Sequence, residues 1–494
     1  MRRIGRVVIL GGGTAGWMTA AALAATLGNT VAITVLESDE IGIVGVGEAT
    51  IPTIHWFNEL IGLDEASFLR ATKATFKLGI EFVDWARPGH RYFHPFGRYG
   101  VDAGSIPFHQ CWLRAQADGA DAPLASYSLA TALAAAGRFA KPVADPRSIL
   151  STLGYAYHFD ASLYGRHLRE LAEARGVSRR EGKMRAVKRD ADTGFVTGLD
   201  VEDGTTIEGD LFIDCSGFRA LLIEGAMERA YEDWSRWLPC DRAVAVPCVR
   251  VAPTTPFTRS TLREAGWQWR IPLQHRTGNG HVYASAFMDD DAATATLLAN
   301  LDGAPLAEPR LLRFRTGLRR ESWQGNVVAI GLAAGFLEPL ESTSIHVIQS
   351  AIAKLITLFP DRDCDPALAR QFNTLMARDM ESIRDFLVLH YTATAEHATP
   401  LWQYTRAMAV PETLADKIAQ YRRSGRLMLS SDELFREASW LAVLNGQGVV
   451  ARGHAPLADT LDRAANLRQV AQIREVIARA APTLPMHDEA VAAA

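Results

Sequence analysis

The chain has 494 residues, of which 48% are hydrophobic, and a formal net charge of −4. This length and composition predict a globular protein with a large core and two or three structural units. A charge so close to neutral excludes the protein classes that bind nucleic acid or anionic membranes through a basic surface. No run of the sequence approaches the roughly 18 apolar residues of a membrane span.

The cysteines indicate a reducing, cytoplasmic setting. There are five, an odd number without CxxC or metal-ligand spacing, so neither a disulfide framework nor a metal site is expected. They are Cys111, Cys215, Cys240, Cys248 and Cys364. Three arginines precede the apolar run at residues 7–10, but that run is too short for the core of a signal peptide and leads directly into glycines.

The first 37 residues predict a nucleotide-binding unit. A strand at Val7–Leu10 is followed by the glycine turn Gly11-Gly-Gly-Thr-Ala-Gly16 and a helix over Trp17–Leu27. Such a turn brings backbone N–H groups to a pyrophosphate. A second strand, Val31–Leu36, ends in Glu37, where an acid binds ribose hydroxyls. A GxGxxG pattern alone is weak evidence, but this context favours FAD over NAD.

Three further segments are expected to belong to the same cofactor-binding unit. Residues 41–52 alternate glycine with Ile and Val and include Gly45-Val-Gly-Glu-Ala-Thr50, so the backbone could lie flat on a planar ligand. Asp210–Arg219 and Asn326–Gly335 are predicted as strands that return to this unit. The predicted cofactor-binding residues are Gly11, Gly13, Thr14, Ala15, Gly16, Glu37, Gly45, Gly47, Ala49 and Leu332.

Residues Phe76–Phe82 alternate apolar side chains with others, which predicts a strand with Lys77 on the opposite face from Phe76. Taken alone, Lys77 is a solvated lysine. His94-Pro-Phe-Gly97 follows, and its histidine could pack in the core or face a ligand.

Gly266-Trp-Gln-Trp-Arg-Ile-Pro272 predicts a half-buried strand that ends at its proline. A Trp-rich core strand would explain it equally if it stood alone. Phe336-Leu-Glu-Pro-Leu-Glu-Ser-Thr-Ser-Ile-His346 carries Glu338 and Glu341 before a predicted helix. The N–H groups of Thr343 and Ser344 could bind a small anion there, or the segment could serve only as a helix cap.

These motifs together resemble the flavin-dependent halogenases of the tryptophan halogenase type, as far as about residue 459. The shared patterns are WxWxIP, the Phe-Lys segment, Gly45–Thr50 and FLEPLEST. The pattern is closest to the indole-brominating members. The resemblance implies an α/β fold: a discontinuous, Rossmann-like FAD-binding domain of the flavin monooxygenase type, a substrate-binding region and a helical C-terminal part.

The resemblance also implies the reaction. Reduced FAD (FADH2) from a separate flavin reductase, oxygen and chloride or bromide give hypohalous acid, and Lys77 hydrogen-bonds this acid or forms a haloamine. Glu341 accepts the ring proton or orients the electrophile beside Lys77, Ser342 supports it, and Thr343 and Ser344 bind the halide. Ser344 stands where many members have glycine, so the choice between chloride and bromide stays open.

For the substrate, the resemblance implies an electron-rich aromatic compound such as an indole, contacted by His94, Phe96 and Trp440. The tyrosine pair that grips the amino-acid backbone in tryptophan-specific members is missing from residues 399–404 and 451–456. Free tryptophan is therefore not the first choice. The sequence leaves the native substrate, its regioselectivity and a homodimeric assembly open.

The domain prediction follows from these segments. Residues 1–85, 150–220 and 320–360 form the FAD-binding domain, 86–149 and 221–319 form the substrate pocket, and 361–494 form a mostly helical region that covers it. Two alternatives remain: a flavin-dependent aromatic hydroxylase, which Leu332 disfavours because hydroxylases have an acid there, and a non-catalytic flavin-binding protein, which Lys77 and Glu341 disfavour.

Overall fold

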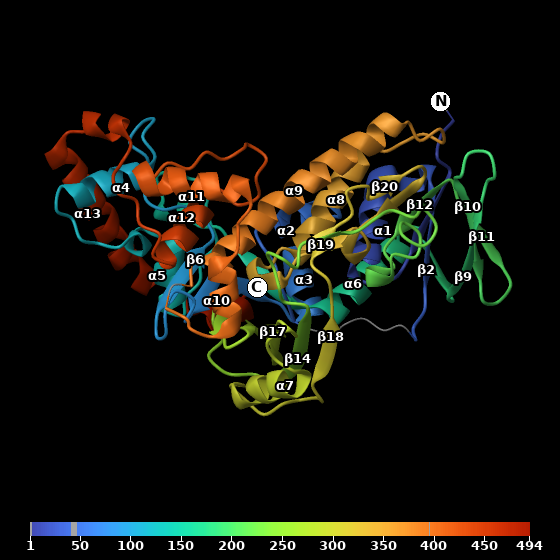
Figure 1. Cartoon of the computed structure of the whole chain (residues 1–494), viewed down its shortest axis with the longest axis horizontal. Coiled ribbons are helices and arrows are strands. Elements are labelled where there is room, and N and C mark those ends of the chain that lie inside the picture. The colour runs from blue at the N-terminus through green and yellow to red at the C-terminus, as the bar shows by residue number, and fades with distance from the viewer. Residues whose placement is uncertain (1, 41–46, 395) are drawn as a thin grey trace. The chain divides into compact units, whose positions relative to one another are not determined.

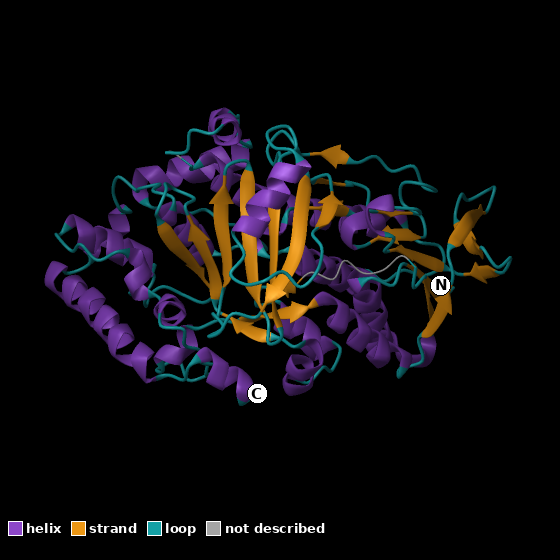
Figure 2. Cartoon of the chain, turned by 90° about the horizontal axis from the view of Figure 1, so that it is seen from below, coloured by secondary structure: helices purple, strands orange, loops and turns teal. Residues whose placement is uncertain are grey.

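The computed structural model describes residues 2–40, 47–394 and 396–494. They divide into two compact units, each built from three segments of the chain. Unit 1 comprises residues 1–74, 159–235 and 313–381, and unit 2 comprises residues 75–158, 236–312 and 382–494. The fold is mixed α/β with a helical C-terminal part, as the sequence predicts (Figures 1 and 2).

Unit 1 contains a six-stranded sheet whose order is β20-β21-β12-β1-β2-β8. Its strands are β1 (Arg6–Leu10), β2 (Ala32–Glu37), β8 (Ser178–Glu181), β12 (Leu211–Asp214), β20 (Trp323–Gln324) and β21 (Val327–Ala329). The four inner pairings are parallel, and only β20 runs antiparallel. Buried Val, Ile, Leu and Phe side chains fill β1 and β12, as expected for a parallel sheet covered on both faces.

The helices of unit 1 come from all three of its segments. They are α1 (Thr14–Leu27), α2 (Ile54–Leu60), α3 (Glu65–Thr72), α6 (Ala161–Glu173) and α8 (Ser344–Thr357), and α9 (Pro366–Thr392) contains the boundary to unit 2. Helix α1 lies against α6 and α8. A separate small sheet consists of β9 (Met184–Arg189), β10 (Val196–Val201) and β11 (Thr206–Glu208), coloured green in Figure 1.

Unit 2 contains a seven-stranded sheet of order β18-β14-β17-β16-β15-β5-β6, whose long strands lie side by side in Figure 2. Its strands are β5 (Gly79–Val83), β6 (Arg91–Pro95), β14 (Arg242–Val249), β15 (Thr258–Arg263), β16 (Gly266–Pro272), β17 (Arg276–Tyr283) and β18 (Arg310–Arg313). Two further strands, β4 (Thr75–Lys77) and β7 (Ala156–Asp160), pair antiparallel.

The helices of unit 2 belong mostly to the C-terminal part of the chain. They are α4 (Phe108–Ala117), α5 (Leu129–Ala135), α7 (Asp290–Ala299), α10 (Pro400–Ala407), α11 (Glu412–Ser424), α12 (Glu437–Gly446), α13 (Arg463–Ala480) and α14 (His487–Ala492). The predicted helical character beyond residue 365 is confirmed.

The predicted single strand over Phe76–Phe82 is wrong. Two strands, β4 and β5, lie in different sheets and are separated by Leu78. Gly79 has φ 159°, and a Cβ there would lie 2.2 Å from the carbonyl oxygen of His94. The close approach of β6 therefore breaks the alternation that the sequence predicts.

The WxWxIP strand is β16, and it ends at Pro272 as predicted. It is not half-buried, however, because all seven residues are buried. Trp269 pairs with Gly280 on β17, where a Cβ would lie 2.0 Å from the indole ring. Strand β16 therefore lies inside the sheet with both faces covered, whereas the sequence predicts a strand with one face exposed.

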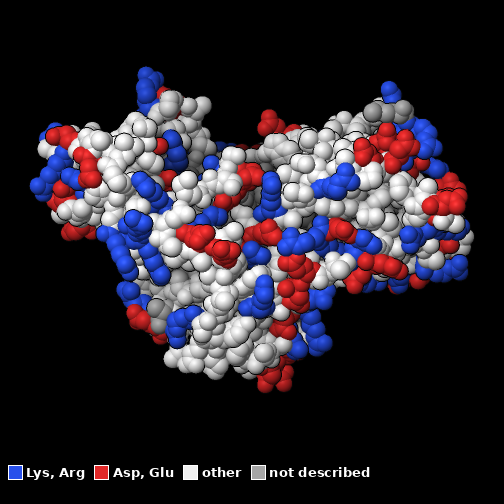
Figure 3. Space-filling view, turned by 45° about the horizontal axis from the view of Figure 1, so that its top comes forward, with Lys and Arg blue, Asp and Glu red and all other residues white. Residues whose placement is uncertain are grey.

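The described cysteines are all buried and free, so the chain has no disulfide in the part that the structure describes. Basic and acidic side chains are intermixed on the face that Figure 3 draws. Among the described helices, none is long and apolar enough to cross a membrane.

Candidate functional site

The glycine turn of unit 1 has the geometry of a phosphate-binding turn. Gly11 has φ 111°, and a Cβ on Gly11 or on Gly16 would collide with backbone at 2.3 and 1.9 Å. At Gly13, the N-cap of α1, a Cβ would meet nothing within 4 Å. The first and last glycines thus allow close backbone packing, while open space lies before the N-terminus of a 14-residue helix, where backbone N–H groups attract an anion.

Glu37 lies at the end of β2, against this turn. A Cβ on Gly12 would lie 1.5 Å from its carboxylate, which accepts a hydrogen bond from the indole N–H of Trp17 at 3.3 Å. Arg179 on β8 forms an ion pair with it, and Arg169 lies 3.7 Å away. The acid is therefore placed beside the turn, as the dinucleotide pattern requires, with partners that the sequence did not predict.

The remaining predicted cofactor residues also lie in unit 1. Thr14 and Ala15 begin α1, and Gly47 and Ala49 lie in the short strand β3 (Gly47–Ala49). Leu332 is 39% exposed in a 3-10 turn at Gly331–Ala333. Gly45 lies outside the described residues.

The FLEPLEST segment forms a tight turn before α8. Glu338 precedes a single 3-10 turn, Pro339–Glu341, and Ser342 follows it in the left-handed region at φ 60°. Both carboxylates are buried, Glu338 at 0% and Glu341 at 1% exposure. A buried acid in a strained turn is typical of a functional group, since the surrounding fold must hold it in place.

The start of α8 offers donors to a halide. Thr343 is the N-cap residue, but its side chain makes no capping hydrogen bond, and Ser344 is the first helical residue. The Thr343 hydroxyl is buried and has no hydrogen-bond partner among the residues that the structure describes. The helix-cap explanation for this segment is therefore wrong for the side chain of Thr343, and the donor set fits a small anion.

Lys77 lies in unit 2 and is fully buried, at 0% exposure, so the solvated-lysine explanation is wrong. Its ammonium nitrogen lies 5.2 Å from the centroid of the Phe96 ring. Burial of an ammonium is costly, and lysines are almost never fully buried unless they are paired.

Two hydrogen bonds fix the strand that carries Lys77. The hydroxyl of Thr75 donates to the carbonyl of Pro272 at 2.7 Å and lies 3.1 Å from Nδ1 of His158. Because the hydroxyl proton is already donated, Nδ1 must carry the ring proton, and Nε2 accepts from Thr258 at 3.0 Å. Burial, followed by the charge of Lys77, lowers the pKa of His158 well below its usual value. The Thr75 hydroxyl thus joins β4 to the end of the WxWxIP strand, and a neutral His158 joins β4 to β15 through Thr258.

Five aromatic side chains of unit 2 form what we call the ring cluster: His94, Phe96, Phe386, Phe435 and Trp440. The His94 ring lies 6.4 Å from Phe96, 5.8 Å from Phe386 and 6.2 Å from Phe435. Phe386 stacks on Phe435 at 3.9 Å and meets Trp440 edge-on at 5.0 Å. All three predicted substrate residues therefore belong to one cluster, next to Lys77 through Phe96.

The sequence interpretation missed Phe386 and Phe435, which both lie in the C-terminal part of the chain. It also missed Lys417, which lies 5.0 Å over the Trp440 ring and forms an ion pair with Glu433 at 3.0 Å. Helical periodicity could have placed Phe386 on an inward face of α9. No local pattern marks Lys417, because its position depends on tertiary packing.

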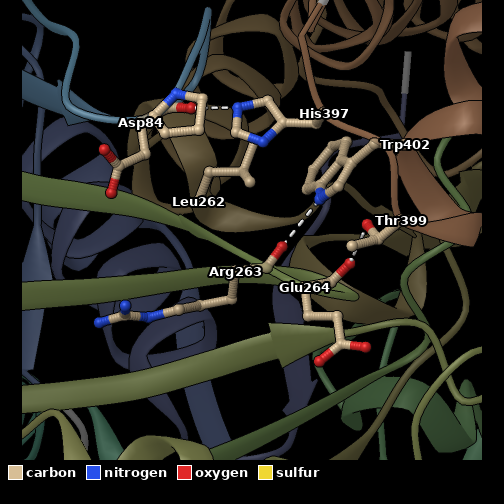
Figure 4. Close-up of a pocket in the computed structure, with 8 residues that line it drawn as sticks. Asp84, Leu262, Arg263, Glu264, His397, Thr399 and Trp402 are labelled. Carbon is tan, nitrogen blue, oxygen red and sulfur yellow. Dashed lines mark hydrogen bonds between the residues drawn. The ribbon is translucent and has the colours of Figure 1, made fainter.

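A groove of about 290 Å³ elsewhere in unit 2 does not have the character of a substrate site (Figure 4). Trp402 and Thr399 donate to the backbone carbonyls of Arg263 and Glu264, each at 2.7 Å, and His397 bonds to the Asp84 carbonyl. Trp402 and Thr399 thus join the α10 region to the β15–β16 turn, and His397 bonds to the residue that follows β5.

Comparison with known proteins adds independent evidence. The tryptophan halogenase family model matches residues 6–463. Tryptophan 6-halogenase SttH of Streptomyces toxytricini is 36% identical over 99% of this chain and 98% of its own length. The chain belongs to the tryptophan halogenase family.

Two solved structures of this family resemble the chain over nearly its full length. BrvH, a flavin-dependent halogenase from Brevundimonas sp. BAL3, has a TM-score of 0.95 and 48% identity over 99% of both chains. Xcc4156, a flavin-dependent halogenase from Xanthomonas campestris, has a TM-score of 0.95 and 46% identity over 99% of this chain and 98% of its own. The protein is thus a flavin-dependent halogenase that uses FADH2 and halide and acts on an aromatic substrate.

Proposed function

We propose that the protein halogenates an indole that lacks an amino-acid backbone, with Lys77 and Glu341 as its catalytic residues and FADH2 from a separate flavin reductase. The observation that carries the proposal is the fully buried Lys77 against the ring cluster. Bound reduced FAD, with oxygen and halide, supplies the electrophilic halogen as hypohalous acid. Unit 1, with the glycine turn, Glu37 and the halide donors, is the proposed FAD-binding domain.

Lys77 is proposed to bind this acid through its ammonium group or to form a haloamine. A compact ammonium has three donors and, in a dry setting, polarises a bound oxygen strongly. Attack by the aromatic ring on the halogen forms the carbon–halogen bond. The ring proton then passes to the carboxylate of Glu341, which restores aromaticity.

The ring cluster supports an aromatic, uncharged substrate. Aromatic walls bind flat rings through stacking and edge contacts. The charged groups beside Trp440, Lys417 and Glu433, are bonded to each other, so neither is committed to the ammonium or carboxylate of a free amino acid. SttH is named for tryptophan, whereas this chain lacks a tyrosine pair at residues 399–404 and 451–456. We also propose that the protein is located in the cytoplasm.

The test combines FAD, a flavin reductase, NADH and bromide or chloride with a panel of bulky indoles and free tryptophan, and reads product masses. Indoles without an amino-acid backbone should turn over at least as well as tryptophan. A strong preference for tryptophan would contradict the proposed substrate class. Lys77→Ala should abolish product while oxygen still reoxidises the flavin; retained activity would refute the role of Lys77.

A hydroxylase would behave differently in the same assay. Its bound flavin would be reduced directly by NADPH, and product would form without halide. Stopped-flow reduction of bound FAD by NADPH, with no added reductase, distinguishes the two enzymes. We expect NADPH alone to reduce the bound FAD slowly, and we expect product to form only when halide is present.

A further inference from the structure

The last helix of the chain, α14, packs against the strand that carries Lys77. Its first residue and the segment before it form backbone hydrogen bonds with residues 137–139: His487 N–H donates to Gly137 at 2.9 Å, and Phe139 N–H donates to Pro485 at 3.1 Å. Helix α14 also contacts β4 directly. All these residues belong to unit 2, and α14 lies beyond the residues that the family model matches.

The side chain of His487 closes a layer of aromatic rings behind β4. Phe76 and Phe139 stack with centroids 4.1 Å apart and planes 4° apart. His487, at 0% exposure, meets both rings edge-on at 6.5 and 6.3 Å. Phe76 directly precedes Lys77, and neighbouring side chains of a strand point to opposite faces. The layer therefore supports β4 from the face opposite to the ammonium.

Hydrogen bonds hold His487 in one orientation. Its Nδ1 lies 3.0 Å from the carbonyl oxygen of Thr254, which can only accept, so Nδ1 is the donor. The carboxylate of Asp488 accepts from the backbone N–H of Thr254 at 3.3 Å. Burial lowers the pKa of His487, while the Thr254 carbonyl and Asp488 favour the charged form and Arg250 opposes it. The ring is therefore a neutral, fixed part of the layer at neutral pH.

We propose that α14 is a positioning element for the catalytic lysine, and that His487 is the positioning residue through which it acts. His487 contacts the Phe76–Phe139 pair rather than the substrate, and it limits how far β4 can move. The inference rests on the proposed role of Lys77. Misplacement of a reacting group by about 1 Å can cost roughly 10²-fold in rate, so a small shift of β4 would be measurable.

Three variants and one control test this inference in the full reaction with FAD, reductase, halide and an accepted indole. His487→Ala removes both the ring and the donor, whereas His487→Phe keeps the ring and removes the donor. Removal of residues 487–494 deletes α14 entirely. Removal of residues 491–494 alone leaves His487 and Asp488 in place and serves as the matched control.

Three quantities are measured for each protein: the rate at which oxygen reoxidises bound reduced flavin, the halogenated product formed per flavin oxidised, and free hypohalous acid caught by a small-molecule trap. For His487→Ala and the 487–494 deletion, we expect unchanged flavin reoxidation. Product per flavin should fall about 10- to 10²-fold, and trapped hypohalous acid should rise. Product per flavin should fall less in His487→Phe, and the control should give the same values as the full chain.

The outcomes separate this inference from the proposed function. If Lys77→Ala is inactive while every His487 variant keeps the full product per flavin, the positioning role is refuted and the lysine mechanism stands. If Lys77→Ala remains active, the lysine mechanism itself fails. A parallel fall in flavin reoxidation and product would show general structural damage and would also refute positioning.

The thermal unfolding midpoint of each variant is measured first, and all assays are run at a temperature below the lowest midpoint. Should the 487–494 deletion fail to fold, the comparison of His487→Ala with His487→Phe decides the question.

Discussion

Glu338 and Glu341 are two buried carboxylates three residues apart, and only the second is proposed to transfer a proton. Glu341→Gln keeps the size and hydrogen bonding of the side chain but removes its charge. We expect the halogenation rate to fall by roughly 10²–10⁴, as for the loss of a positioned acid–base group, with flavin reoxidation nearly unchanged. Single-turnover formation of halogenated product measures the effect.

Glu338→Gln is the internal control for this prediction. Its side chain is equally buried and lies in the same turn, so general damage to the turn should affect both variants alike. We expect a much smaller loss for Glu338→Gln. Equal losses, or a larger loss at Glu338, would require the base to be reassigned.

Among the elements of unit 1, one buried side chain directly before β21 binds the start of β10 and the residue before β12. The amide of Asn326 donates to the carbonyls of Val196 and Asp210 at 2.7 and 3.0 Å, and its oxygen accepts from Val196 N–H at 2.9 Å. Asn326→Ala would leave these backbone groups buried without their partner. We expect a loss of about 3 kcal/mol in the free energy of unfolding, measured by urea denaturation.

Asn300→Ala is the control for that stability change. Asn300 is exposed at the C-terminal end of α7, where its amide donates to the Thr296 carbonyl at 2.8 Å. Its loss should cost less than about 1 kcal/mol. Comparable effects of the two substitutions would contradict the importance of the buried amide.

For the whole molecule, buried histidines predict a loss of stability in acid. Burial lowers the pKa of His281 and of His346 to about 4, below the value of about 6.5 expected in the unfolded chain. The unfolded state therefore binds more protons between pH 6.5 and 4, so stability is present above pH 6.5 and falls as the pH drops. At pH 5 each histidine should cost about 2 kcal/mol.

Urea midpoints measured between pH 7.5 and 5 test this dependence. His281→Asn keeps a donor for the Ala293 carbonyl, which lies 3.2 Å from Nδ1, and removes one titrating group. The variant should lose about 2 kcal/mol less than the parent over the same pH range. An identical pH dependence for the two proteins would show that His281 does not contribute.

The sequence by itself determined the class of fold, the nucleotide-binding start and the family. These features depend on local rules: glycines at a turn, an acid at the end of a strand, and helical periodicity after residue 365. Gly16 could be interpreted correctly because its close backbone contact, with the carbonyl of Gly11, arises within the first β–α unit, whereas the contact of Gly11 with the carbonyl of Cys215 depends on the sheet.

Only the tertiary structure decided which groups are buried together. Lys77 has the local pattern of an exposed lysine, yet the pairing of β4 with β7 and the break at Leu78 bury it completely. Phe386 and Lys417 reach Trp440 from two other segments of the chain, and Phe435 stacks on Phe386. His487 reaches Phe76 across about four-fifths of the chain. Such contacts depend on long-range packing, which no short stretch of sequence encodes.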